Sequence, residues 1–153
     1  MNKTVLKYGG YGLATGFIIF MLHLIVGIDN LDYKTNEILG YLSIFLSLSF
    51  IYFAIKHYRD AINNGMISFW KAVAIGVLIS LFVAVGIGIA DFVYTKFINP
   101  DFFSNYEQKL IDEGRENEII KMTSSMAALF MIVLVTIIGF IISLLSALFL
   151  QRR

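Results

Sequence analysis

Long apolar runs alternate with short polar segments along the chain, and this pattern predicts helices that cross a membrane. A hydrocarbon core about 30 Å thick needs about 20 predominantly apolar residues in helical form. Because lipid offers the backbone no hydrogen-bond partners, each run is expected to be a helix. The expected spans cover residues 6–28, 37–56, 69–95 and 123–150. We therefore predict a single domain, residues 1–153, built as an all-α bundle of four transmembrane helices.

Composition supports this prediction and excludes several classes of protein. Apolar residues make up 58% of the chain and charged residues 15%, whereas about 25% of an ordinary soluble domain is charged. The mean hydropathy is +0.78. These values exclude a soluble enzyme of ordinary build, a nucleic-acid-binding protein and a disordered chain. The amino-terminal apolar run has no small-x-small cleavage pattern before Asp29, so we interpret it as a retained span.

The side chains that most often hold metals are scarce. The chain has no cysteine, which excludes disulfides and thiolate chemistry, and its two histidines are His23 and His57. Two histidines are too few for a histidine-rich metal cage. We expect no metal and no cofactor.

Positive charges are unevenly distributed between the two ends of the predicted spans, and this asymmetry indicates the orientation. One side has a single acid, Asp60, and the bases Lys3, Lys7, Lys56, Arg59, Lys71, Arg152 and Arg153. The other side has ten acids, from Asp29 through Glu118, together with the bases Lys34, Lys96, Lys109, Arg115 and Lys121. Segments rich in lysine and arginine stay in the cytoplasm. We therefore expect both ends of the chain to be cytoplasmic and residues 96–122 to lie outside.

The 96–122 segment is expected to form a helical extracytoplasmic hairpin between the third and fourth spans. Asn99-Pro100-Asp101 has the order of an N-cap, a first-turn proline and an acidic residue, and Gly114 fits a helix C-cap. Phe103, Tyr106 and Leu110 then share one helix face. That face either rests on the bilayer interface or docks an external protein.

A resemblance to a known family is carried by the second half of the second span and the loop after it. The matching residues are Tyr58-Arg59-Asp60, Asn64-Gly65, Ile67-Ser68-Phe69, Lys71-Ala72 and Gly76, with Gly139, Ile142-Ser143-Leu144 and Ser146-Ala147-Leu148 near the carboxyl end. These residues resemble an uncharacterised bacterial family catalogued as domain of unknown function 4199. The resemblance implies a four-span protein of the bacterial cytoplasmic (inner) membrane and implies no activity.

Three ionisable residues are predicted within or beside the spans, where such groups are costly and often functional. His23 and Asp91 lie far along the first and third helices, and Glu37 begins the second. At 1.5 Å per residue, all three reach the outer part of the bilayer, where we predict that His23 and Asp91 approach each other in an intramembrane polar cluster that Glu37 can join. An imidazole beside carboxylates suits a proton relay or a cation site. The alternative is that three interfacial side chains reach headgroup water.

Small residues are expected to pack the bundle. Gly12 and Gly16 form a GxxxG motif, and Ser143 and Ala147 repeat that spacing on the last helix. We expect the serine hydroxyls of the spans to form hydrogen bonds between helices. At the cytoplasmic ends, a basic and aromatic rim is predicted to orient the protein and contact headgroups; its members are Lys56, Arg59, Trp70 and Lys71.

The sequence contains none of the common enzyme motifs, and this limits the possible functions. The chain contains no HExxH, GxSxG, P-loop or dinucleotide-binding glycine motif, so we expect no enzyme. The leading hypothesis is a non-catalytic interaction or accessory subunit. Its partners are the bilayer and another membrane or extracytoplasmic protein, bound through residues 96–122. The alternative is a small oligomeric channel or proton-coupled carrier that uses His23 and Asp91, supported by a faint repeat of glycine and serine positions between the two halves.

The predicted topology can be tested by labelling. The short inner loop, 57–68, is expected to turn at Asn63-Asn64-Gly65 and to end at Ser68 as the N-cap of the third span. Asn64 therefore lies in this inner loop and Asn105 in the long outer one. Single cysteines at these positions are expected to react with a membrane-impermeant maleimide from opposite sides of intact cells. Labelling of both positions from the same side would contradict the four-span topology.

Overall fold

The structure, a computed structural model, describes residues 1–30 and 33–152, with side-chain surroundings for 1–27 and 35–152. Within this part of the chain there is no strand, which confirms the all-α class. Four helices in it are long and apolar enough to span a membrane: Asn2–Gly27, Thr35–Ile62, Phe69–Ile98 and Ser124–Leu150. These are the helices of a multi-pass membrane protein.

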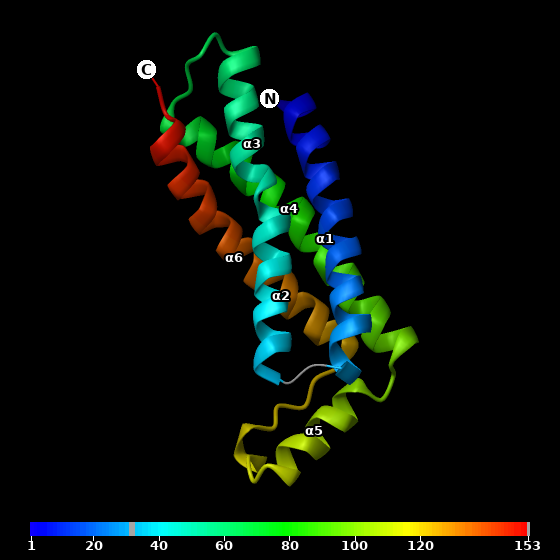
Figure 1. Cartoon of the computed structure of the whole chain (residues 1–153). Helices are drawn as coiled ribbons and strands as arrows, with labels where there is room; N and C mark the ends of the chain where they lie inside the picture. The colour runs from blue at the N-terminus through cyan, green and yellow to red at the C-terminus, as the bar shows by residue number, and fades with distance from the viewer. Residues whose placement is uncertain (31–32, 153) are drawn as a thin grey trace.

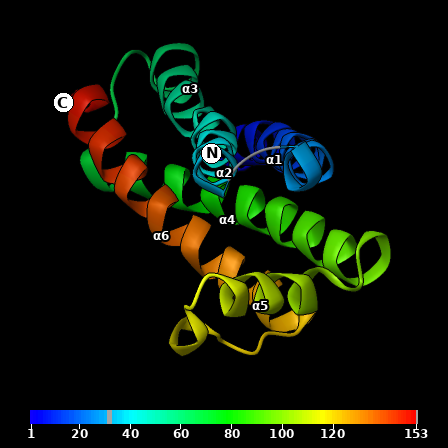
Figure 2. The same cartoon turned by 60° about the horizontal axis from the view of Figure 1, so that its bottom comes forward.

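The helices are arranged with both chain ends at the same end of the bundle. In chain order they are α1 (Asn2–Asn30), α2 (Tyr33–Leu48), α3 (Phe50–His57), α4 (Phe69–Val93), α5 (Phe102–Asp112) and α6 (Ser124–Leu150). α2 and α3 form one span that is interrupted at Ser49, whose hydroxyl donates to the Leu46 carbonyl at 2.7 Å. Figures 1 and 2 show α5 at the far end of the bundle, opposite the two termini.

The second and third spans are longer than their apolar runs because each ends in a π-helical turn. These turns are Tyr58–Ile62 and Tyr94–Ile98. Each closes with a bond from an asparagine N–H to the tyrosine carbonyl five residues earlier, at 3.0 Å for Asn63 and 2.8 Å for Asn99. The expected ends at residues 56 and 95 were therefore too early, because polar residues continue a helix once it reaches the headgroup region.

α4 is the central helix, and α1, α3 and α6 pack against it (Figure 2). Glycines allow close approach on two sides of α4. A Cβ at Gly86 would collide with the Leu13 backbone of α1, and one at Gly88 would lie 3.2 Å from the Ala128 carbonyl of α6. Gly12 and Gly16 of α1 lie against Val83 and Ile87 of α4. Ser143 and Ala147 of α6 are fully buried, and Ser143 contacts Gly76 of α4.

The serine hydroxyls within the spans bond to their own helices. Ser43 donates to the Leu39 carbonyl, Ser47 to the Ser43 carbonyl and Ser143 to the Gly139 carbonyl, at 2.6–2.8 Å. The expectation of hydrogen bonds between helices was wrong for these serines. A carbonyl four residues earlier is always within reach of a serine in a helix, so the donor is satisfied locally. The serines then act as small residues that let neighbouring helices approach.

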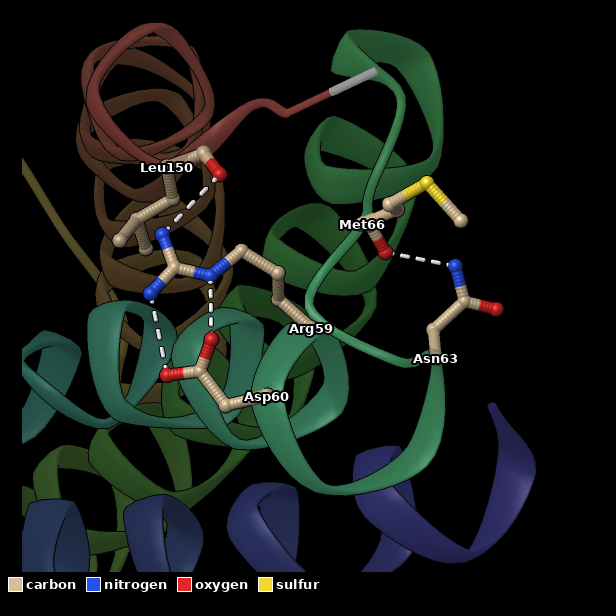
Figure 3. A network of polar contacts seen from close by, with 5 residues as sticks. All are labelled: Arg59, Asp60, Asn63, Met66 and Leu150. Atoms are coloured by element: carbon tan, nitrogen blue, oxygen red, sulfur yellow. Dashed lines mark hydrogen bonds and ion pairs between the residues drawn. The ribbon is translucent and has the colours of Figure 1, made fainter.

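Arg59 joins three segments at the end of the bundle that holds the termini (Figure 3). Its guanidinium donates to both Asp60 carboxylate oxygens, at 2.6 and 3.0 Å, and to the Leu150 carbonyl at the end of α6, at 3.3 Å. Beside it, Ile67 and Arg152 exchange two backbone hydrogen bonds of 2.9 and 3.0 Å. A cation at a helix carboxyl end satisfies carbonyls that have no partner within the helix.

The turn between α3 and α4 has the residues that the sequence predicted. Asn64 and Gly65 adopt φ values of 52° and 79°, a region that asparagine and glycine tolerate. The Gly65 N–H donates to the Arg59 carbonyl at 2.8 Å, and the Asn63 side-chain amide donates to the Met66 carbonyl at 2.6 Å (Figure 3). Ser68 is the N-cap residue of α4, as expected, although its side chain makes no capping bond.

The segment between α4 and α6 contains one α-helix, α5, and a short 3₁₀ turn, Glu116–Glu118. α5 begins at Phe102 rather than directly after Asn99, because Asn99 closes the preceding π-helical turn. Gly114 ends α5 with φ 71°, as predicted. Arg115 then pairs with Glu118 at 2.7 Å, and this hydrogen bond lowers the pKa of the Glu118 carboxyl.

The contact between α1 and α4 can be tested by a substitution that adds one methyl group to α4. Gly86→Ala is expected to lower the unfolding free energy by about 1–3 kcal/mol, because the new Cβ meets the rigid Leu13 backbone. Gly10→Ala on α1 is the matched control, since a Cβ there has no atom within 4 Å. Thermal unfolding in a mild detergent measures both variants. Equal stability of Gly86→Ala and the parent would contradict the packing.

Candidate functional site

A cavity of about 370 Å³ lies at the end of the bundle nearest α5. α1, α2, α5 and α6 all contribute to its walls. Most of its lining is apolar or aromatic, and three polar side chains interrupt it. The lining residues are Phe20, His23, Asn36, Glu37, Gly40, Tyr41, Ile44, Phe102, Phe130, Met131 and Leu134. Such a combination of apolar walls with a few polar groups is typical of small-molecule sites.

His23 and Asn36 are positioned by a reciprocal pair of glycines. A Cβ at Gly40 of α2 would lie 3.4 Å from His23 Nε2, and a Cβ at Gly27 of α1 would collide with the Asn36 side-chain oxygen. Each polar side chain therefore occupies the space left by a glycine on the opposite helix. In both helices the glycine follows the polar residue by four positions, which places the two on the same face.

Two polar atoms of this pair have no hydrogen-bond partner in the part of the chain that the structure describes. They are His23 Nδ1 and Asn36 Oδ1, and both are buried. The His23 ring lies 5.8 Å from the Phe20 ring, centroid to centroid. Glu37 is exposed at the cavity mouth. A buried polar group without a partner costs stability, so its presence here favours a role in binding.

A second hollow lies between α1 and α2 and opens between exposed apolar side chains. It has a volume of about 510 Å³, and its lining is Ile19, Leu22, His23, Val26, Gly27, Leu39, Leu42, Ser43 and Leu46. Leu22, Leu42 and Leu46 are each more than half exposed, so the groove faces the surroundings of the bundle. His23 lines both this groove and the cavity. Its imidazole therefore stands between them.

Comparison with known families gives one match. The family model described as a protein of unknown function, DUF4199, matches residues 7–152. The chain belongs to this family. The match includes the whole bundle, the cavity and the groove. No curated protein and no solved structure matches the chain.

The part of the DUF4199 resemblance from Tyr58 to Ala72 lies at the termini end of the bundle, outside the cavity lining. Tyr58, Arg59 and Ile67 are buried there, and Arg59 holds the end of α6. Lys71 Nζ lies 5.1 Å from the centre of the Tyr58 ring. These contacts close the fold at that end. The motif therefore identified the architecture of a DUF4199 chain and did not identify its cavity.

Asp91 is separated from the cavity lining. It is buried in α4, and its Oδ2 atom has no partner among the described residues. Within the described chain, no hydrogen bond or ion pair joins Asp91 to His23 or Glu37. The structure thus brings His23 and Glu37 to one cavity and leaves Asp91 outside its lining. Nor do three histidine or acidic side chains of the described chain gather closely enough to hold a metal ion.

The expected cytoplasmic rim contains three exposed residues and one buried one. Lys56, Lys71 and Trp70 are exposed, Trp70 to 75%. Arg59 departs from the expected rim because its side chain turns inward and is 7% exposed. The reason is the carboxyl end of α6, whose Leu150 carbonyl accepts from the guanidinium. The remaining three are free to contact headgroups, as aromatic and basic residues do at membrane interfaces.

Sequence reasoning missed Asn36, Gly27 and Gly40. Asn36 is uncharged and lies beside a polar turn, where asparagine is common. A signal was nevertheless present, because His23-x-x-x-Gly27 and Asn36-x-x-x-Gly40 repeat one spacing in consecutive antiparallel helices. Each pattern places a polar side chain and a gap on the same helix face, so two such helices fit together reciprocally.

Replacing the polar pair is expected to increase stability. His23→Leu or Asn36→Leu should raise the unfolding free energy by about 1 kcal/mol, because each removes a buried atom without a partner. Ser47→Ala is the control, since the Ser47 hydroxyl has its partner at 2.8 Å and its loss brings no gain. Reversible unfolding in detergent gives the three values. A loss of stability in both leucine variants would show that the polar atoms have partners.

Proposed function

We propose that the protein is a non-catalytic multi-pass membrane protein that acts by binding, as an interaction or accessory subunit. The observation that carries this proposal is the closed middle of the bundle. Between the cavity and the end with the termini, apolar side chains from α2, α3, α4 and α6 are fully buried; they include Leu48, Ile51, Ile79, Val83 and Val135. A bundle filled in this way supports a binding site that opens near one end only.

The described contacts of the cavity favour binding over catalysis. Nucleophilic catalysis needs a base that is hydrogen-bonded to a nucleophile and oriented by a third group. Within the described chain, His23 makes no hydrogen bond to a hydroxyl or a carboxylate. Its closest aromatic contact is the Phe20 ring. An imidazole held by packing alone is suited to forming part of a wall.

We place the binding surface at the end with α5, on the outer side of the bacterial cytoplasmic membrane, with both termini in the cytoplasm. The lysine and arginine asymmetry supports this orientation. α5 contributes Phe102 to the cavity and buries Leu110, while its other face is polar and exposed. A membrane or extracytoplasmic partner that binds residues 96–122 would therefore contact the cavity wall as well.

A second candidate, a small oligomeric channel or proton-coupled carrier, is favoured by one observation. Asp91 is a buried carboxylate within a span, and its Oδ2 atom lacks a partner among the described residues. Ionisable groups at such depth often mark proton pathways. With the middle of the single bundle filled, a path from Asp91 to His23 would have to be completed by further copies of the chain.

Flux measurements discriminate between the two candidates. Proteoliposomes that contain the protein are expected to pass protons no faster than protein-free liposomes, because the apolar side chains fill the middle of the bundle. His23→Ala and Asp91→Asn should leave this background unchanged. A proton flux that is abolished by Asp91→Asn would overturn the proposed function and favour the carrier.

Photo-crosslinking tests the binding surface. A crosslinking amino acid at Asn105 or Asn117, both exposed in the outer segment, is expected to capture one defined protein in intact cells. The exposed Asn64 position at the other end is the control and should not capture that protein. Capture from Asn64 alone would place the partner at the wrong end for this proposal.

A further inference from the structure

The cavity and the groove adjoin at the His23 side chain, which lines both, and together they suit an amphiphilic molecule. One compartment has polar groups and aromatic walls, and the other is almost entirely apolar. Their volumes, about 370 and 510 Å³, each lie within the range of about 300–1,000 Å³ found for small-molecule sites. The groove opens on the sides of α1 and α2 that face lipid, so a molecule enters it most directly from the membrane.

We propose that the cavity binds the primary ammonium headgroup of a membrane lipid and that the groove holds one of its acyl chains. This inference rests on the proposed binding function and names its ligand class. The occupant is a lipid with an aminoethyl type of head, at the end of the bundle nearest α5.

Charge complementarity selects a cation. Among the lining residues that the structure describes, Glu37 is the one charged side chain, and none is a lysine or an arginine. Aromatic rings from Phe20, Tyr41, Phe102 and Phe130 complete the wall. The face of an aromatic ring attracts a cation within about 6 Å, and this attraction grows when water is excluded. An anionic headgroup would meet the Glu37 carboxylate, which repels it.

Hydrogen-bond chemistry selects a primary ammonium among the cations. A primary ammonium has three N–H donors, whereas a quaternary ammonium has none. The lining supplies three groups with acceptor capacity: the imidazole of His23, the amide oxygen of Asn36 and the carboxylate of Glu37. Within the described chain, no hydrogen bond occupies the His23 or Asn36 side chain. Neither side chain is therefore committed to another protein group.

The groove is suited to the acyl chain. Apart from His23 and Ser43, its lining side chains are apolar, and the Ser43 hydroxyl is satisfied by the Leu39 carbonyl at 2.8 Å. Leu22 and Leu42 are exposed by 56% and 57%. Apolar side chains that form a concave surface toward lipid offer an acyl chain more contacts than a convex helix face does. The lipid headgroup and its acyl chain then lie on opposite sides of the His23 imidazole.

Lipid binding can be measured by native mass spectrometry of the full-length protein released from nanodiscs. The probes are phosphatidylethanolamine, phosphatidylcholine and phosphatidylglycerol with identical acyl chains. We expect phosphatidylethanolamine to be retained about tenfold more strongly than phosphatidylcholine, and phosphatidylglycerol least. Glu37→Gln removes the charge that opposes an anionic headgroup, so it should bring the retention of phosphatidylglycerol close to that of phosphatidylethanolamine. Glu116→Gln, an exposed acid in the outer segment, is the control and should keep the ratio of the parent.

Two further experiments test the headgroup contact and the acyl-chain contact separately. Dodecylammonium is expected to displace bound phosphatidylethanolamine, whereas free ethanolamine at the same concentration should not. Leu42→Trp fills the groove and should weaken lipid retention, while Leu148→Trp, on an equally exposed part of α6, should not. Equal displacement by ethanolamine would overturn the lipid as the source. Thermal unfolding of each variant confirms that it is folded before binding is compared.

The outcomes distinguish this inference from the proposed function. Equal retention of phosphatidylethanolamine and phosphatidylcholine, with no effect of Glu37→Gln, would overturn the ligand class even when the liposomes show no proton flux. A clear preference for phosphatidylethanolamine together with an Asp91-dependent flux would instead support the ligand and overturn the binding-only function.

Discussion

The bundle depends on how closely other helices can approach α4. In lipid, an apolar side chain gains little by leaving the bilayer for a helix interface, so association relies on close packing of surfaces. α4 meets α1 and α6 at glycines where a larger side chain would collide, with the Leu13 backbone at Gly86 and with the Ile132 side chain at Gly88. These contacts fix the positions of α1 and α6 against α4. The cavity lies beyond this tightly packed region, where residues of α1, α2, α5 and α6 line it.

Glycines also shape the polar site, but in a different way. Between α1 and α4, glycines bring backbones together, whereas between α1 and α2 they leave space for a polar side chain from the opposite helix. Gly40 receives His23 and Gly27 receives Asn36. The pair therefore packs without an ion pair and without a hydrogen bond among the described residues. A site held by shape alone keeps its polar atoms available, at a cost that close packing elsewhere offsets.

The sequence was sufficient for the parts of the fold that depend on local chemistry. Apolar run length located the four spans, and Asn64-Gly65 and Gly114 located two turns, because each property belongs to neighbouring residues. Features that depend on distant residues were not predictable. Arg59 looked like a surface base until the end of α6 was placed beside it. His23 and Glu37 were expected near Asp91 from depth alone, yet depth does not fix which face of a helix a residue occupies. The π-helical turns share a Tyr-x-x-x-Ile-Asn pattern. Only the backbone hydrogen bonds, from the asparagine N–H to the tyrosine carbonyl, show that this pattern forms a π-helical turn.

The hydrogen bond between the Arg59 guanidinium and the Leu150 carbonyl joins residues 91 positions apart. It can therefore form only after almost the whole chain has been synthesised. During synthesis, the first three spans can enter the membrane before α6 has been made. Throughout that interval the Arg59 guanidinium has Asp60 but lacks its carbonyl partner, and the α6-facing side of α4 is open to lipid. Arrival of α6 covers that side and completes the arginine's hydrogen bonds in a single step. A nascent chain stopped before residue 124 would thus leave Gly76, Ser80 and Gly88, the α4 positions that α6 covers, open to lipid.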